Sequence, residues 1–364
     1  MNNRFLFIFI SATASALVIA GIFFYPDLIN APSFSFGADS VDAISITEEE
    51  VPVFEKEKSV ASMLVVGDIM LDRTVFEHTK KAKDFNHPFL LIDPLFQKPY
   101  DLRVANLEGP VTNFKSVALT SRFTFTFNPD FVGPLKKRFE VLSLANNHTT
   151  NFGQKGLDQT RKRLQDGGIM FFGDPNNTAG FISTTTSVNG ITFGFVGHHQ
   201  LIEKGFDRII ADIKKLDKEV DVVIVLPHWG HEYKTDKPSA LQKKEALAMV
   251  DAGADIIFGA HPHVIQPIEV YKGKFIFYSF GNFIFDQYFS RETSEGLAIK
   301  AMFTKEDGIV TPQFELIPLS INKLSQPYVA VEADKKRILE HLRKTFIGNK
   351  TVQALVPSGI VYLP

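Results

Sequence analysis

The chain has 364 residues, of which 45% are hydrophobic and 22% charged, a balance typical of one large globular domain with tails or of two domains. Its formal net charge is -2, so no global charge excess favours a nucleic acid or an anionic surface as a partner. Cysteine is absent, which excludes disulfides, thiolate metal ligands and a cysteine nucleophile and suits a protein outside the cytoplasm.

The N-terminal segment 5–25 contains neither a charged residue nor proline. As a helix it would be about 30 Å long, which is the hydrocarbon thickness of a bilayer. Arg4 precedes the segment and Asp27 follows it, a weak bias that favours an N-terminus inside the cell and a body outside. We therefore predict a single-pass anchor in the cell membrane over residues 1–25, with a signal peptide cleaved near Ala14 as the alternative.

Residues 26–60 combine Pro, Ser, Gly and Asp with an acidic run at 48–50, and they show no helical or strand period. This composition predicts a flexible tether, with a loosely packed N-terminal arm as the alternative. The folded body is expected over residues 61–320, followed by a C-terminal helix and tail over residues 321–364.

The body alternates short apolar runs with helical stretches, which predicts an α/β fold. The predicted strands are residues 63–66, 102–105, 140–144, 169–172, 183–188, 191–196, 220–226, 256–258, 268–271, 274–278, 297–303 and 310–317. The predicted helices are a stretch after Arg73 and residues 156–165, 207–218, 239–252 and 334–345. Asn189-Gly190 between two of the strands is the strongest short signal for a β-hairpin.

Polar residues of metal-ligand type follow five of the predicted strands. They are Asp68, Asn106 with Glu108, Asn147 with His148, His228, and His261 with His263. Carboxylates, imidazoles and an amide suit Zn, Mn or Fe better than a soft metal, and the carboxyl ends of strands are where open α/β sheets bind ligands. Taken alone, His261 and His263 fit two metal ligands or two ordinary loop histidines equally well. The whole set favours two divalent ions, which can activate a bridging water and hold the oxygens of a phosphoryl group.

Six ordered motifs carry a resemblance to a known family. They are GDIMLDR at 67–73, NLE at 106–108, LANNH at 144–148, HWGHEY at 228–233, GAHPH at 259–263 and YSFGNFIFD at 278–286. Together they resemble the CapA family of bacterial capsule-synthesis proteins linked to poly-γ-glutamate, a family similar to the calcineurin-like metallophosphatases. The resemblance covers about residues 63–319. It implies a four-layer α/β/β/α metallophosphatase-like sandwich, here preceded by the N-terminal transmembrane helix.

The resemblance also implies a role for each matched position. The metal ligands would be Asp68 and His263 for the first ion, Asn147, His228 and His261 for the second, and Glu108 as the bridge between them. His148 would face the leaving group as a general acid or as a donor to the phosphate. The residues expected to contact the substrate or to support the ligands are Arg73, Asn106, Asn146, Glu232, Asn282 and Asp286.

Several residues keep a second interpretation. Asp68 could cap the following helix, but the motif favours a ligand. Arg73 is expected to bind an anionic substrate group, with an ion pair to Asp72 as the alternative, and Asn146 is expected to hold its turn through side-chain bonds. Glu232 is either a supporting partner or a solvated loop residue. The histidines expected to be structural or exposed are His78, His87, His198, His199 and His341.

Two positions depart from the related patterns. Met70 stands where metallophosphatases place a histidine ligand, and a thioether is a poor ligand for hard divalent ions. The first metal is therefore expected to bind weakly or not at all. Asn151 stands where CapA relatives usually carry an aspartate.

These observations support two main functions. The first is a membrane-anchored extracytoplasmic metal-dependent hydrolase that acts on a phosphoester or an anionic polymer in the synthesis of capsule, poly-γ-glutamate or another envelope polymer. The second is a non-catalytic CapA-type accessory subunit that assists polyglutamate assembly or export beside a membrane capsule synthase complex, and Met70 favours it. An anchored binding domain for an anionic polymer is a third possibility, but the motifs lack a strong Lys/Arg cluster.

Overall fold

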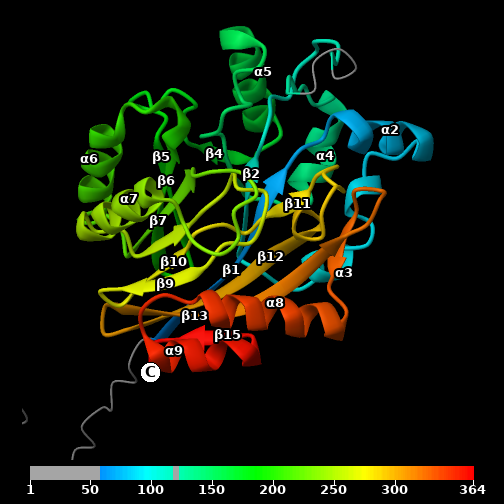
Figure 1. Cartoon of the computed structure of the whole chain (residues 1–364). Coiled ribbons are helices and arrows are strands. Elements are labelled where there is room, and N and C mark those ends of the chain that lie inside the picture. The colour runs from blue at the N-terminus through cyan, green and yellow to red at the C-terminus, as the bar shows by residue number, and fades with distance from the viewer. Residues whose placement is uncertain (1–57, 118–122) are drawn as a thin grey trace, which may run out of the picture. The chain divides into compact units, whose positions relative to one another are not determined.

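The computed structural model describes residues 58–117 and 123–364, so the predicted membrane anchor and nearly all of the tether lie outside the described residues. No helix in the described ranges is long and apolar enough to cross a membrane. The body is a mixed α/β sandwich of two β-sheets, which confirms the predicted class (Figure 1).

The larger sheet has nine strands and is built around β1. The path runs β14-β13-β12-β1-β2-β3-β4, with β11 added beside β1 and β15 beside β13. Its strands are β1 (Lys58–Ile69), β2 (Leu102–Leu107), β3 (Val141–Ser143), β4 (Met170–Phe172), β11 (Asn282–Ile284), β12 (Glu295–Glu306), β13 (Ile309–Ile321), β14 (Pro327–Val329) and β15 (Ile360–Tyr362). Because β1, β2, β3 and β11 run parallel, their carboxyl ends lie at one edge.

The smaller sheet has six strands in the order β5-β6-β7-β8-β10-β9. They are β5 (Ser183–Val188), β6 (Ile191–His199), β7 (Val222–His228), β8 (Ile256–Phe258), β9 (Ile268–Tyr271) and β10 (Lys274–Phe277). The predicted hairpin joins β5 to β6, and Asn189 and Gly190 have φ angles of 50° and 77°, as a type I′ turn requires. Strands β6, β7 and β8 are parallel, so they also end at one edge.

The main core lies between the two sheets, because alternate residues of a strand point to opposite faces. On β1, Val65 belongs to the core shared by both sheets, whereas Leu64 belongs to the core on the outer face. Phe193 of β6 and Phe303 of β12 meet in this shared core, with ring centroids 5.0 Å apart and edge to face. The apolar side chains of both sheets therefore hold the sandwich together.

Helices cover the outer faces of both sheets. Residues of α2 (Arg73–Ala82), α3 (Asp93–Phe96), α4 (Val132–Lys136) and α5 (Gly153–Asp166) pack in the outer core of the larger sheet. Residues of α6 (Phe206–Leu216) and α7 (Ala240–Asp251) pack in the outer core of the smaller sheet. The α7 helix begins at a capping box made by Ser239 and Gln242, a local signal that agrees with its predicted start.

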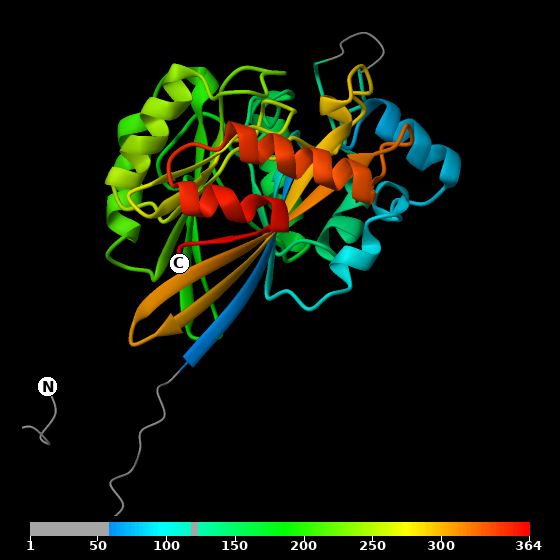
Figure 2. The same cartoon turned by 60° about the horizontal axis from the view of Figure 1, so that its bottom comes forward.

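The C-terminal residues add to the larger sheet. α8 (Glu332–Thr345) and α9 (Lys350–Leu355) pack in the shared core beside Phe314 and Leu316 of β13, and Figure 2 shows both helices in front of the sheet. β15 pairs with β13, so the chain after residue 321 is part of the same folded body.

The sequence did not predict α3, α4, α9, β11, β14 or β15. The three strands have three residues each, which is too short for a periodic pattern. β11 and β15 also pair with strands that are distant in sequence, whereas β14 pairs with the nearby end of β13. β1 is also longer than predicted, because residues 58–65 pair with β12.

Candidate metal centre

The strand ends of the two sheets meet at one place. Asp68 at the end of β1 pairs in register with Asn106 of β2 and with Asn282 of β11. His228 ends β7 and forms a β-bridge with Ala260, immediately before His261. Strand ends of both sheets therefore bring predicted site residues together.

Two glycines allow this close approach of the backbone. A Cβ atom on Gly67 would lie 2.0 Å from the carbonyl oxygen of Gly281, and one on Gly259 would lie 2.1 Å from the carbonyl oxygen of Tyr278. Glycine at both positions lets Asp68 and His261 follow strands that are in backbone contact.

The first group of possible ligands is Asp68, Glu108 and His263, whose ligand atoms lie within 4.8 Å of one another. His263 Nδ1 lies 3.5 Å from Asp68 Oδ2, and His263 Nε2 lies 3.6 Å from Glu108 Oε1. The ring of His263 is oriented by Asn282, whose Oδ1 lies 3.0 Å from Nδ1. In this position Asn282 would support His263 as a ligand of a bound metal.

The second group is Glu108, His228 and His261. His228 Nε2 lies 4.0 Å from Glu108 Oε1 and 2.9 Å from Asn147 Oδ1, so the amide oxygen and the imidazole meet on this side of the centre. Glu108 belongs to both groups, which is the position that the family resemblance implied for a bridge. A third group joins the exposed Glu232 to His261 and His263.

The chemistry of these residues fits a divalent cation. Both carboxylate oxygens of Glu108 are buried and have no hydrogen-bond partner among the described residues. Burial and the neighbouring Asp68 raise the pKa of Glu108 well above its usual range, and burial raises the pKa of Asp68 to about 7. An uncompensated buried carboxylate is strongly unfavourable, and a cation between the two groups would remove that penalty.

The imidazoles are suited to the same partner. Burial lowers the pKa of His261 to about 3 and lowers the pKa values of His228 and His263 well below their usual range. Neutral imidazole is the form that binds metal ions. The residues therefore provide oxygen and nitrogen donors of the type used by Zn, Mn and Fe.

Asn106 contacts Asp68, and Asn146 in turn contacts Asn106. Asn106 Nδ2 donates to Asp68 Oδ1 over 2.8 Å, and Asn106 Oδ1 accepts from Asn146 Nδ2 over 3.1 Å. Asn146 Oδ1 also accepts from the backbone N–H groups of His148 and Thr149. Asn146 thus holds its turn through side-chain bonds, as the sequence predicted.

His148 lies at the edge of the centre, stacked on Phe125 with ring centroids 4.1 Å apart. Its Nδ1 lies 3.1 Å from Asn151 Oδ1, which also accepts the backbone N–H of Phe125, so Nδ1 carries the proton. Nε2 then carries a lone pair that can accept a hydrogen bond, and it lies 3.8 Å from Glu108 Oε1. Burial lowers the pKa of His148 to about 4, so the imidazole is neutral near pH 7.

Arg73 and Asp286 form an ion pair beside His148. The Arg73 guanidinium lies 4.9 Å from the ring centroid of Phe125, while the second oxygen of Asp286 accepts the backbone N–H of Thr74 over 3.1 Å. Arg73 therefore pairs with Asp286 and not with Asp72, the alternative raised from sequence. Asp72 caps α2 instead, which leaves Asp68 free of the capping role.

A cavity of about 760 Å³ opens next to this ion pair. Its wall includes Tyr233, whose ring stacks near His263 at 6.2 Å, and Phe289, which is 66% exposed. Arg73, Asp286 and these aromatic rings make it a suitable space for part of a ligand that reaches the centre.

Met70 does not face the centre. It is fully buried in the outer core of the larger sheet, and its sulfur accepts the backbone N–H of Asp72 over 3.1 Å. The first group thus lacks the extra imidazole that metallophosphatases place at this position. Trp229 is also a packing residue, since it is fully buried and its Nε1 donates to the carbonyl oxygen of Tyr278 over 2.8 Å.

Two residues near the centre were missed or undervalued from sequence. Asn151 orients His148, although it replaces the aspartate usual in CapA relatives. His199 is buried, which agrees with the structural role expected from sequence, but it also ends β6 in register with His228 and so lies near the centre. The signal that could have identified His199 is its place after a buried strand, which it shares with the predicted ligands.

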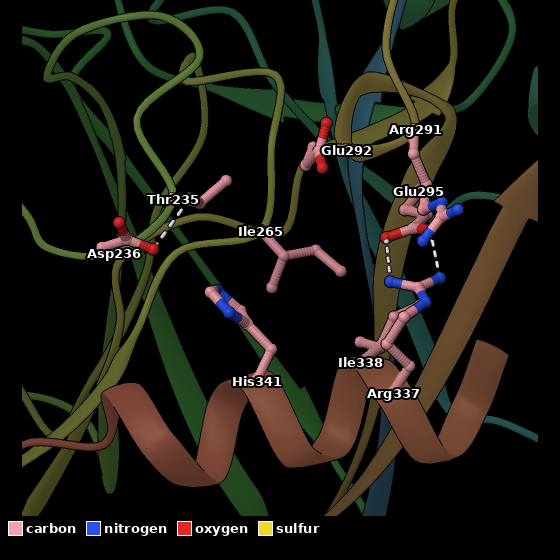
Figure 3. A pocket seen from close by; sticks show the side chains of 9 residues that line it. All are labelled: Thr235, Asp236, Ile265, Arg291, Glu292, Glu295, Arg337, Ile338 and His341. Atoms are coloured by element: carbon pink, nitrogen blue, oxygen red, sulfur yellow. Dashed lines mark hydrogen bonds and ion pairs between the residues drawn. The ribbon is translucent and has the colours of Figure 1, made fainter. Parts of the chain in front are cut away.

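A second cavity of about 340 Å³ is lined by none of the predicted site residues (Figure 3). Its lining residues are Thr235, Asp236, Ile265, Arg291, Glu292, Glu295, Arg337, Ile338 and His341. Arg337 and Glu295 pair with each other on one side, and Figure 3 shows His341 extending from α8 on the other. The lining contains carboxylates and one imidazole, but none of them belongs to a group of ligand atoms that could hold a metal ion among the described residues.

The region of the chain that matches a known family contains all six sequence motifs, which lie between residues 67 and 286. The model of the family "Bacterial capsule synthesis protein PGA_cap" matches residues 62–287. The PGA biosynthesis protein CapA of Bacillus subtilis (strain 168) is 35% identical over 304 residues, which cover 78% of this chain and 78% of that protein. The capsule biosynthesis protein CapA of Bacillus anthracis is 32% identical over 323 residues, with 82% and 76% covered.

Solved structures show a more distant likeness. The calcineurin-like phosphoesterase YfkN from Bacillus subtilis is 16% identical, covers 71% of this chain and 91% of that chain, and has a TM-score of 0.43. A phosphatase from Mycoplasma pneumoniae is 15% identical, with 72% and 95% covered and a TM-score of 0.45. At these scores the likeness carries no functional argument.

Proposed function

This chain belongs to the bacterial capsule synthesis protein family, and we propose on that premise that its centre is that of a metal-dependent hydrolase in capsule or poly-γ-glutamate synthesis. The observation that carries the proposal is the buried environment of the Glu108 carboxylate. Its two buried oxygens have no hydrogen-bond partner in the described part of the chain. Glu108 also belongs both to the group with Asp68 and His263 and to the group with His228 and His261. A buried carboxylate in that position is explained by a cation.

Two divalent ions, of Mn, Fe or Zn, are proposed with Glu108 between them. One would be held by Asp68 and His263 and the other by His228, His261 and Asn147. Bound there, such ions supply Lewis-acid stabilisation to the oxygens of a phosphoryl group. The chain's own residues do the rest: Asn106 and Asn282 orient two of the ligands.

His148 is the proposed catalytic residue. The Asn151 contact fixes its tautomer, so its Nε2 faces the centre as a hydrogen-bond acceptor. A neutral imidazole with this orientation accepts a proton, and it acts as an acid only after it has been protonated. Arg73 and Asp286 are proposed to contact the substrate, a phosphoester or the anionic polymer itself, from the adjoining cavity.

The remaining features of the hydrolase are proposals of the same kind. Residues 1–25 would anchor the chain in the cell membrane, residues 26–60 would form the tether, and the body would lie outside the cell beside a membrane capsule synthase complex. The apolar segment 5–25 and the capsule proteins among the relatives support this arrangement. Helices on both outer faces support the four-layer α/β/β/α sandwich of metallophosphatases.

A non-catalytic accessory subunit is the second candidate, and Met70 is the observation that favours it. With the sulfur bonded to the backbone of Asp72, the first ion has few protein ligands. A centre with one tightly bound ion could stabilise the fold without hydrolysing a substrate.

Metal analysis and hydrolysis together distinguish these functions. The full chain would be purified in detergent, loaded separately with Mn, Fe and Zn, and assayed with a generic phosphodiester. Bound metal with hydrolysis that is lost in His148→Ala, but kept in His341→Ala, supports the hydrolase. Bound metal without hydrolysis supports the accessory subunit, and a chain that binds none of the three metals refutes the centre. Membrane fractionation of a chain lacking residues 1–25 tests the anchor, which is wrong if that chain stays in the membrane.

A further inference from the structure

His199 is the last residue of β6 and lies directly beside His228, the last residue of β7, in the parallel register of the two strands. Neighbours in register point to the same face of a sheet, whereas consecutive residues point to opposite faces. His198 accordingly points to the helices, where it contacts Glu245 of α7 and Phe206 of α6. His199 therefore points to the face on which His228 meets Glu108.

The backbone of His199 is held in place on both sides by Asn177. The N–H of His199 donates to Asn177 Oδ1 over 2.9 Å, and its carbonyl oxygen accepts from Asn177 Nδ2 over 2.9 Å. Asn177 is itself fully buried. These bonds fix the backbone from which the His199 ring extends.

The ring of His199 is fixed as well. Its Nδ1 lies 2.7 Å from the carbonyl oxygen of Pro175, and because a carbonyl only accepts, Nδ1 carries the proton. Nε2 therefore carries a lone pair that can accept a hydrogen bond. It is buried and has no hydrogen-bond partner among the residues that the structure describes. A buried acceptor without a partner is unfavourable, so Nε2 is expected to receive a hydrogen bond from a donor.

The side chains near His199 indicate which site its Nε2 faces. The His199 ring centroid is 6.0 Å from that of His228, and a positive charge on His199 would act on both His228 and His261. A ring N–H bonded to a backbone carbonyl, with the other nitrogen free, is the arrangement by which proteins orient imidazoles around a metal. The groups of ligand atoms within 4.8 Å do not include His199, so its distance suits a bridging water better than a direct ligand bond.

We propose that His199 is a positioning residue of the metal centre, whose Nε2 accepts a hydrogen bond from a water molecule on the His228–His261 side. The inference rests on the proposed metal centre but not on hydrolysis. It adds to the site a strand end that none of the six sequence motifs contains.

The test compares His199→Ala with His198→Ala in the full-length chain. Mn affinity is measured by titration calorimetry, and the absorption spectrum of the Co-substituted protein reports the surroundings of the ion. His199→Ala should lower Mn affinity about 10–100-fold and change the Co spectrum, as loss of a supporting contact does. His199→Gln, which offers an amide oxygen as an acceptor, should restore part of the affinity.

His198→Ala is the matched control, because it removes a buried imidazole from the same strand but on the helix side. It should lower thermal stability through the lost Glu245 contact and leave Mn affinity and the Co spectrum unchanged. A folded His199→Ala variant with wild-type affinity and spectrum overturns the inference alone. A wild-type chain that binds no Mn or Co overturns the metal centre and this inference together.

Discussion

Substitution of Asp68 by Asn tests the electrostatic basis of the centre. Burial raises the pKa of Asp68 from its usual 3.8 to about 7, so the folded chain without metal holds this proton more tightly than the unfolded chain does. Below about pH 4 the carboxyl is protonated in both states and has no effect. As the pH rises from there to about 7, the metal-free fold loses up to about 4 kcal/mol through this group, at about 1.4 kcal/mol for each pH unit.

The Asn variant keeps an oxygen for Asn106 Nδ2 but has no charge at any pH. Its amide faces the backbone N–H of His261, which adds a constant penalty of about 1–3 kcal/mol. The buried histidines have lowered pKa values and favour the fold as the pH rises, but they do so in both chains. The stability of Asp68→Asn relative to wild type should therefore increase by up to about 4 kcal/mol between about pH 4 and pH 8.

Urea unfolding with a chelator present measures this difference, with the fluorescence of Trp229, which is the single tryptophan and fully buried, as the signal. Added Mn should stabilise wild type more than the variant, because the variant loses Asp68 as a ligand but keeps the group of Glu108, His228 and His261. Asp84→Asn is the control, because hydrogen bonds from Asn86 lower the pKa of the Asp84 carboxyl. The stability of this variant relative to wild type should therefore decrease as the pH rises. A difference between Asp68→Asn and wild type that does not change with pH would refute the reasoning.

Three further substitutions test other contacts. Phe193→Ala removes the ring that meets Phe303 between the sheets and should lower the free energy of unfolding by about 3–5 kcal/mol in urea; a loss below about 1 kcal/mol would contradict the packing. Gly67→Ala places a Cβ 2.0 Å from the carbonyl oxygen of Gly281, so it should separate β1 from β11. Mn affinity measured by calorimetry should then decrease, and an unchanged affinity would count against this geometry. Asn151→Asp places a carboxylate at the contact now 3.1 Å from His148 Nδ1, which should raise the pKa of His148 from about 4 by about 1–3 units in an NMR titration; an unshifted imidazole would show that the contact is absent.

The local elements were predictable because their signals are local. Asn189-Gly190 predicted the β5–β6 hairpin, and short continuous apolar runs predicted the central strands of both sheets. The α7 helix began where Ser239 could cap it. Each of these signals involves residues a few positions apart, so the surrounding fold changes them little.

The sequence by itself also determined which residue types end the strands, and with them the set from Asp68 to His263 that the structure brings together. Only the tertiary structure decided how these side chains are used. Met70 turns its sulfur to the backbone of Asp72, Arg73 pairs with Asp286 across 213 positions, and His199 stands beside His228. The physical reason is that these partners are selected by the register of strands and by the packing of two sheets, and neither is encoded in the residues next to them in the chain.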